Sequence, residues 1–110
     1  MHPGVKPNGD VIRLPVELDR ASVTQLRARV ERLGHGTSIT FDGSRIRRAD
    51  SAGVQLLCAL VLSAEGRGVT VSWTAVSPVL LTYVSLLGVG GVMRFDGVPP
   101  DDPDLPDWVN

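Results

Sequence analysis

Four consecutive residues near the middle of the chain combine a carboxylate, a hydroxyl and a glycine: Asp50, Ser51, Ala52 and Gly53. They stand between a short basic connection and a strongly apolar run, Val54 to Leu62, which has the length and composition of a buried helix. A serine hydroxyl at the beginning of a helix can carry a phosphate, because the free amide groups there favour an anion. A hydroxyl in this setting is therefore a candidate site for a phosphate. The structural alternative is that Asp50 and Ser51 only cap the helix, which contributes about 1 kcal/mol.

The segments that must position this tetrapeptide are predicted as alternating strands and helices. Hydrophobic residues alternate with polar ones at Val69, Val71 and Trp73, which is typical of a half-buried strand. Ser22 followed by Gln25 predicts a capping box at the start of the first helix, and Asn8-Gly9 predicts a hairpin turn after a strand stub at Val5-Lys6. We expect strands at 11–15, 38–42, 69–74 and 92–95, and helices at 22–33, 51–64 and 77–88.

This order of elements predicts an α/β fold in which helices pack on a sheet with parallel neighbours. A chain of 110 residues is long enough for one domain with its own core. We assign that domain to residues 1–96. Residues 97–110 contain four prolines and four aspartates and read as an acidic C-terminal tail. Removal of this tail is expected to cost less than about 2 kcal/mol of folding free energy.

Composition argues against several classes of function. A net charge of -1 gives no basic excess to attract nucleic acid. Cys58, the single cysteine, lies inside the apolar run and is expected to be a reduced core residue. His2 and His35 have no companions at metal-ligand spacing, so no metal is expected. The glycines at 88–91 lack the lysine of a phosphate-binding loop, so no nucleotide cofactor is expected either.

The distribution of apolar residues predicts a cytoplasmic protein that does not insert into a membrane. The first seven residues contain no apolar stretch typical of a signal peptide. The longest uninterrupted apolar run, Leu56 to Leu62, is far shorter than the roughly 20 residues that a helix needs to cross a bilayer.

Three motifs in this order resemble the STAS domain family, which comprises the anti-sigma-factor antagonists and their relatives. The segment Val16-Glu17-Leu18-Asp19 stands where the family has Gly-Glu-Leu-Asp. Asp42-Gly43-Ser44 with Ile46 matches the family's Asp-Leu-Ser-x-Val, and residues 50–54 match its Asp-Ser-Ser/Ala-Gly-Leu signature. The resemblance extends over residues 5–95. The chain differs from the family at Val16, at a short opening hairpin, and at 47–49, where two arginines and an alanine replace residues that are usually apolar.

The resemblance implies a mixed sheet of four or five strands with helices packed mainly on one side. In the family, the serine at the position of Ser51 is phosphorylated by a partner kinase that often doubles as an anti-sigma factor. It also implies a protein-binding surface around this serine. The residues expected on that surface are Asp19, Asp42, Arg47, Arg48, Asp50, Ser51, Ala52 and Gly53.

Three function classes follow, in order of preference. The first is a non-enzymatic bacterial switch module that binds a serine kinase or anti-sigma factor of the HATPase type and is controlled by phosphorylation of Ser51. The second is the small STAS subunit that stabilises the ATPase of a phospholipid-transport ABC complex, and STAS proteins of chemotaxis clusters are a further regulatory variant. An enzyme is the third class, and it would require a deep cavity lined by Asp19, Asp42 and Asp50, since no nucleophile–base pair is evident.

Overall fold

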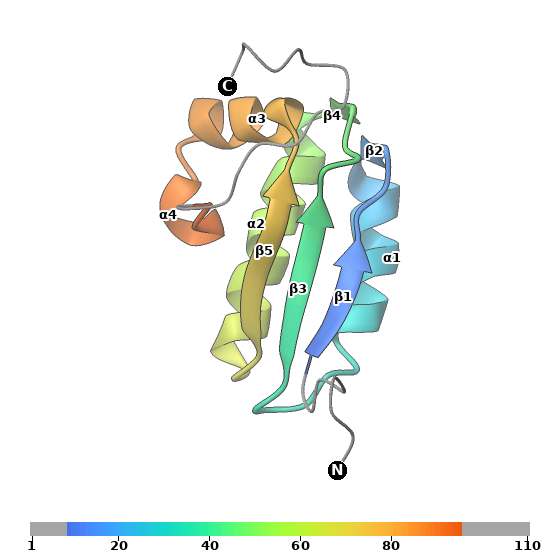
Figure 1. Cartoon of the computed structure of the whole chain (residues 1–110), viewed down its shortest axis with the longest axis vertical. Helices are drawn as coiled ribbons and strands as arrows, with labels where there is room; N and C mark the ends of the chain where they lie inside the picture. Colours follow the sequence, from blue (N-terminus) through green and yellow to red (C-terminus); the bar gives the residue numbers. More distant parts are fainter. Residues whose placement is uncertain (1–8, 96–110) are drawn as a thin grey trace.

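The computed structural model describes residues 9–95, and a parallel sheet of three strands forms its centre (Figure 1). The strands are β1 (Gly9–Arg13), β3 (Ser38–Gly43) and β5 (Thr70–Val76), in the spatial order β1-β3-β5. Both neighbouring pairs are parallel. Parallel strands place their carboxyl ends at the same edge of the sheet, and all three strands end at the edge where the Asp50–Gly53 segment lies (Figure 1).

A second, very short sheet stands at this edge. It pairs β2 (Glu17–Leu18) with β4 (Arg48–Ala49) in parallel, with Leu18 opposite Ala49. Each of its strands leads directly into a helix. The short sheet therefore holds the beginnings of two helices next to each other.

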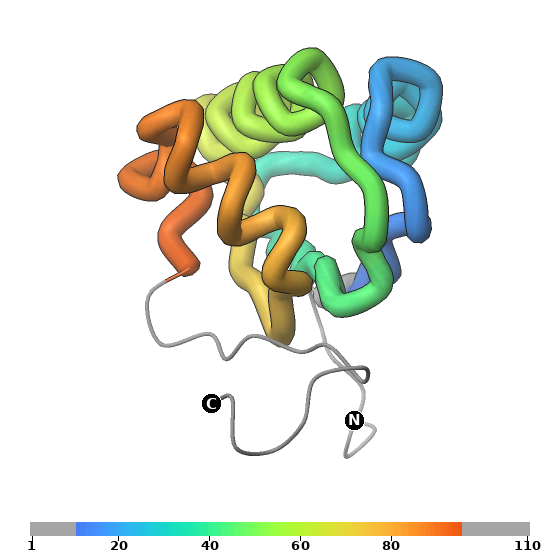
Figure 2. Tube along the Cα trace, turned by 90° about the horizontal axis from the view of Figure 1, so that it is seen from above, coloured from blue at the N-terminus to red at the C-terminus, as the bar shows by residue number. Residues whose placement is uncertain are grey.

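Four helices complete the described part of the chain: α1 (Arg20–Val30), α2 (Ser51–Gly66), α3 (Pro78–Leu87) and the single-turn α4 (Gly90–Met93). Viewed from above, α1 and α2 lie side by side over one face of the sheet (Figure 2). Both α3 and α4 contact α2. The predicted packing of helices mainly on one side is confirmed.

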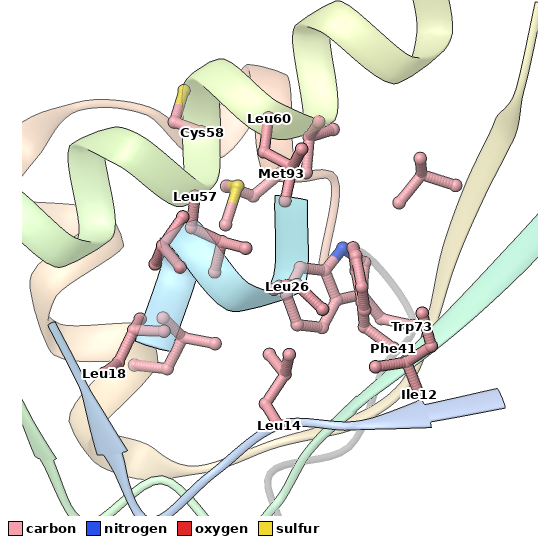
Figure 3. Packing of buried hydrophobic residues seen from close by; sticks show 14 of the residues in the cluster. Ile12, Leu14, Leu18, Leu26, Phe41, Leu57, Cys58, Leu60, Trp73 and Met93 are labelled. Atoms are coloured by element: carbon pink, nitrogen blue, oxygen red, sulfur yellow. The ribbon is translucent and has the colours of Figure 1, made fainter. Parts of the chain in front are cut away.

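The hydrophobic core lies between the sheet and the helices α1 and α2 (Figure 3). On β3, and on β5 as far as Trp73, every second side chain points inward, as the alternation predicts. Beyond Trp73 the register of the two strands shifts. Phe41 and Trp73 lie opposite each other in the register, with ring centroids 5.2 Å apart. The fully buried side chains include Leu14, Leu18, Val30, Ile39, Phe41, Ile46, Val54, Leu57, Val61, Val69 and Leu80.

The sheet differs from the expected one in the number and direction of its strands. Within residues 9–95 the main sheet has three strands rather than four or five, and every pairing is parallel rather than mixed. One predicted strand, residues 92–95, is wrong: the chain forms the helical turn of α4 there, and Arg94 ends it in a left-handed conformation (φ 55°). Short apolar runs do not separate strand from helix by periodicity alone.

The predicted start of the first helix is also wrong: it lies two residues too far toward the C-terminus, and the predicted N-cap three residues too far. The helix begins at Arg20, and Asp19 rather than Ser22 is its N-cap. Ser22 instead completes a capping box with Asp19. The proposed strand stub at 5–6 and the tail at 97–110 lie outside the described residues, and the tail's dispensability remains a prediction.

Candidate functional site

Asp50 is the N-cap of α2, and its carboxylate accepts a hydrogen bond from the backbone amide of Gly53 at 2.6 Å. Ser51 is the first residue of the helix and is exposed, as is Ala52. Among the described residues, the Ser51 hydroxyl makes no hydrogen bond. The capping alternative therefore applies to Asp50 but does not account for the hydroxyl of Ser51.

Gly53 lies where α2 touches the turn between β2 and α1. A Cβ atom at this position would come within 2.5 Å of the backbone oxygen of Leu18 and within 2.8 Å of the Cα atom of Asp19. The atoms in the way belong to the backbone, so a side-chain rotation cannot relieve the contact. Glycine is required here for the close approach of two chain segments, and Gly53 serves the site by positioning Asp19 beside α2.

Asp19 is held by a reciprocal pair of hydrogen bonds at the start of α1. The amide of Ser22 donates to the Asp19 carboxylate at 2.9 Å, and the amide of Asp19 donates to the Ser22 hydroxyl at 3.0 Å. This capping box satisfies two amides that the helix itself leaves unpaired. Asp19 thus has a structural role, and its half-buried carboxylate also faces the site.

The short sheet, the two helix caps Asp19 and Asp50, and the helix α3 surround an open depression of about 470 Å³, hereafter the site hollow. Backbone hydrogen bonds from the amides of Arg47 and Arg48 to the oxygen of Val16 hold its two walls together, at 2.8 and 3.1 Å. The Arg48 guanidinium lies 3.5 Å from the Glu17 carboxylate across the short sheet. The site hollow is lined by Glu17, Leu18, Asp19, Arg47, Arg48, Ala49, Asp50, Val79 and Tyr83.

Four of the predicted surface residues, Asp19, Arg47, Arg48 and Asp50, therefore line one hollow. Ser51 and Ala52 follow Asp50 directly and are exposed, while Gly53 is buried beneath them. The predicted surface did not include the other lining residues: Glu17, Leu18 and Ala49 of the short sheet, and Val79 and Tyr83, which α3 contributes. The apolar stripe of the third helix was the available signal, but a stripe gives no information about which of its members reach the edge of the core.

Asp42 lies elsewhere, at the carboxyl end of β3, and does not line the site hollow. Its carboxylate accepts hydrogen bonds from the hydroxyl and the amide of Ser44, at 2.6 and 3.0 Å, and lies 3.9 Å from the Arg13 guanidinium. The hydrogen bond from the Ser44 hydroxyl is the largest cause that lowers the pKa of Asp42 below its ordinary value of 3.8. Burial opposes this effect, and Arg13 and Arg45 add to it. Asp42 ties the end of the strand to the following turn.

Because the pKa of Asp42 is lowered on folding, the ionised carboxylate stabilises the fold above about pH 4, and this contribution is lost as the pH falls through the folded-state pKa. Ser44→Ala is expected to raise that pKa and to cost about 1 kcal/mol at neutral pH, the net value of one hydrogen bond. The pKa is measured by an NMR titration of the carboxyl carbon, and the stability by thermal unfolding. Ser85→Ala, at an exposed position on α3, is the control. An unchanged pKa of Asp42 in Ser44→Ala would contradict this assignment.

Comparison with known families decides what kind of domain this is. Residues 1–95 match the family model described as "Mlab, STAS domain". The chain belongs to the STAS domain family. A similar solved structure is titled "Structure of the Anti-Sigma Factor Antagonist SpoIIAA in its Unphosphorylated Form". The two chains are 29% identical, with a TM-score of 0.58, and the match covers 81% of this chain and 80% of the other. A comparison with curated protein sequences found no match.

In this STAS domain, neither of the hollows that we describe within residues 9–95 is lined by all three acidic residues that an enzyme would have required. Asp19 and Asp50 line the site hollow, which is open, and Asp42 stands apart from it. Within residues 9–95 no three histidine, cysteine, aspartate or glutamate side chains come together as metal ligands. In the same part of the chain, no helix combines the length and the apolar character that spanning a membrane requires.

Proposed function

We propose that this STAS domain is a non-enzymatic, protein-binding regulatory module of the anti-sigma-factor-antagonist kind, whose affinity for its partner is controlled by phosphate on Ser51. One observation carries the proposal: the hydroxyl of Ser51 is exposed at the first position of a 16-residue helix whose cap is another residue, Asp50. The similarity to SpoIIAA and the family match support it. The partner class that the resemblance to anti-sigma-factor antagonists implies is a serine kinase or anti-sigma factor of the HATPase type.

A phosphate on Ser51 would be tolerated by the fold. The N-terminus of α2 carries a partial positive charge from the helix dipole, which favours an anion there. The carboxylate of Asp50 is already bound to the amide of Gly53 and would repel the phosphate, which keeps the added group directed outward. The domain should therefore change little in stability when it is modified.

The partner would respond much more strongly. Phosphate adds nearly two negative charges and a tightly held hydration shell at a position where an unmodified interface would contact only a small hydroxyl. A charge left buried and unpaired in an interface costs several kcal/mol, and each 1.4 kcal/mol is about a tenfold change in affinity. Phosphorylation would thus release or exclude the partner.

The surface that we assign to the partner consists of the site hollow together with Ser51 and Ala52. Its walls carry both signs of charge: Glu17, Asp19 and Asp50 against Arg47 and Arg48. Mixed charge of this kind favours specificity, because a wrong partner meets like charges. Tyr83, half-buried at the rim, offers an aromatic ring of the type that is enriched at binding hot spots.

A second candidate function is the small STAS subunit of a phospholipid-transport ABC complex. The description of the matching family, which names Mlab, favours it. In that case the domain would bind an ATPase subunit constitutively, and the exposed side of α2, where Leu62 is 53% exposed, would add to the contact. Neighbouring genes separate the two functions: permease and ATPase genes favour this one, and a sensor kinase or sigma-factor gene favours the first.

The proposal is tested by mass spectrometry of the protein isolated from its native host with its bound partner. We expect a phosphopeptide that contains Ser51 in the free pool and unmodified Ser51 in the partner-bound pool. A phosphatase-treated sample is the control. Absence of phosphate on Ser51 under all growth conditions, with the domain permanently bound to an ATPase, would contradict the switch and favour the second candidate.

A further inference from the structure

A second depression, hereafter the arginine hollow, lies between the end of β1, the helix α1 and the connection from β3 to β4. Its volume is about 430 Å³, and each of these three elements contributes one arginine to it: Arg13, Arg29 and Arg45. The remaining lining is polar at Gln25 and Ser22 and apolar around Pro15 and Val16, and it includes no carboxylate among the described residues. Positive charge thus converges from three separate parts of the chain.

The three arginines are only partly neutralised by the fold itself. Arg13 lies 3.9 Å from the Asp42 carboxylate, which stands outside the hollow. Arg45 also interacts electrostatically with Asp42, but neither Arg45 nor Arg29 forms an ion pair within residues 9–95. By contrast, Arg27 on the same helix is bound to Glu31 at 3.1 Å. The guanidinium groups of the hollow therefore remain available to a ligand with carboxylates, which they bind in a planar, two-point geometry.

The arginine hollow adjoins the site hollow along one stretch of chain. Pro15 and Val16 line the arginine hollow, while Glu17 and Leu18, the next two residues, line the site hollow. Two residues of extended chain span only about 7 Å. A stable protein interface buries about 800 Å² on each partner, with some 20–30 residues a side. A protein that covers Ser51 therefore needs a surface larger than the site hollow, and the arginine hollow continues that surface.

We infer that the arginine hollow binds an acidic segment of the protein partner, in which carboxylates flank an apolar residue. The inference rests on the proposed function, because it takes the occupant to be part of the protein that covers Ser51. Carboxylates match the three arginines, and an apolar residue matches the apolar lining at Val16, which is 39% exposed. The segment steers the partner to the site and fixes its orientation, because opposite charges accelerate encounter and disfavour other registers.

The test is an NMR titration of the full chain with a synthetic peptide in which aspartates flank one leucine. We expect the peptide to shift resonances of Arg29, Arg45 and Gln25. Arg29→Ala and Arg45→Ala should each weaken peptide binding by roughly two- to fivefold, as for exposed ion pairs, and raised salt should weaken it further. Arg32→Ala, an exposed arginine outside both hollows, is the matched control and should bind as wild type.

The inference is overturned if Arg32→Ala weakens binding as much as the hollow variants, or if the peptide causes no localised shifts. Inorganic phosphate, titrated in parallel, must not reproduce the shifts; if it does, the hollow is a phosphate site and not a docking site for an acidic segment. With the protein partner, Arg29→Glu and Arg45→Glu are measured beside Ser51→Asp. Wild-type affinity of both glutamate variants, with a loss for Ser51→Asp, removes this inference and leaves the proposed function intact. If both glutamate variants bind weakly and Ser51→Asp binds as wild type, the phosphate switch is contradicted and docking at the arginine hollow is supported.

Discussion

Ser51→Asp is expected to lower the affinity for the protein partner by at least about tenfold, or about 1.4 kcal/mol. The aspartate brings one negative charge, part of what a phosphate would bring, to an exposed position at the start of α2. The substitution should not harm the fold, because an acidic residue in the first turn of a helix is favourable. The measurement is a calorimetric titration of the partner against wild type and variant, with thermal unfolding in parallel.

Ser51→Ala is the matched variant for this prediction. It removes the hydroxyl without adding a charge, and it should bind the partner as tightly as wild type. Its stability should stay within about 0.5 kcal/mol of wild type, since the cap of α2 is Asp50 and not Ser51. If Ser51→Asp and Ser51→Ala bind equally well, charge at this position does not control the interaction.

Gly53→Ala is expected to destabilise the domain by about 1–3 kcal/mol, the usual cost of forcing an extra carbon into a packed interior. The new Cβ would come within 2.5 Å of the Leu18 oxygen, so the turn between β2 and α1 must move away from α2. This movement would also separate Asp19 from Asp50 and weaken partner binding. Denaturant unfolding gives the first effect and the binding titration gives the second.

Gly66→Ala provides the control in the same helix. Gly66 is the last residue of α2, and a Cβ there would meet nothing within 4 Å. Alanine should stabilise this position by up to about 1 kcal/mol, because it is the better helix former. If Gly53→Ala is as stable as Gly66→Ala, the close contact between α2 and the β2–α1 turn does not constrain position 53.

The elements with strong local signals could be predicted from the sequence. The alternation around Trp73 identified β5, and the apolar run after Gly53 identified α2. At α3 the N-cap Ser77, whose hydroxyl accepts from the amide of Leu80, precedes a proline, and Gly88 ends the helix with φ 69°. These signals are carried by neighbouring residues, so they do not depend on the rest of the fold.

The features that were predicted wrongly or missed depend either on contacts between distant segments or on a choice between two neighbouring candidates. The pairing of Glu17–Leu18 with Arg48–Ala49 involves strands of two residues, which are too short to show alternation. At the start of α1, both Asp19 and Ser22 are good caps three residues apart, and in the structure Asp19 caps α1 while Ser22 supports Asp19. Asp42 lies outside the site hollow because it alternates with the buried Phe41 on β3, so its side chain points to the other face of the sheet. This alternation was present in the sequence.

For the site, four of the residues that motif order placed on one surface line the same hollow, and their role in partner binding stays a prediction. The contribution of α3 was not predictable. Tyr83 reaches the site hollow only because α3 packs against α2 and β4. The arginine hollow was likewise invisible in the sequence, since Arg13, Arg29 and Arg45 come from three separate elements.

Phosphate on Ser51 is proposed to control partner binding. The most direct measurement takes one preparation of the wild-type protein, phosphorylates it at Ser51 with its kinase, and titrates the partner against the modified and unmodified forms. Thermal unfolding of both forms confirms that the fold is intact. We expect the phosphorylated form to bind at least about tenfold more weakly, while its unfolding temperature changes little. Equal affinity of the two forms would contradict this proposal.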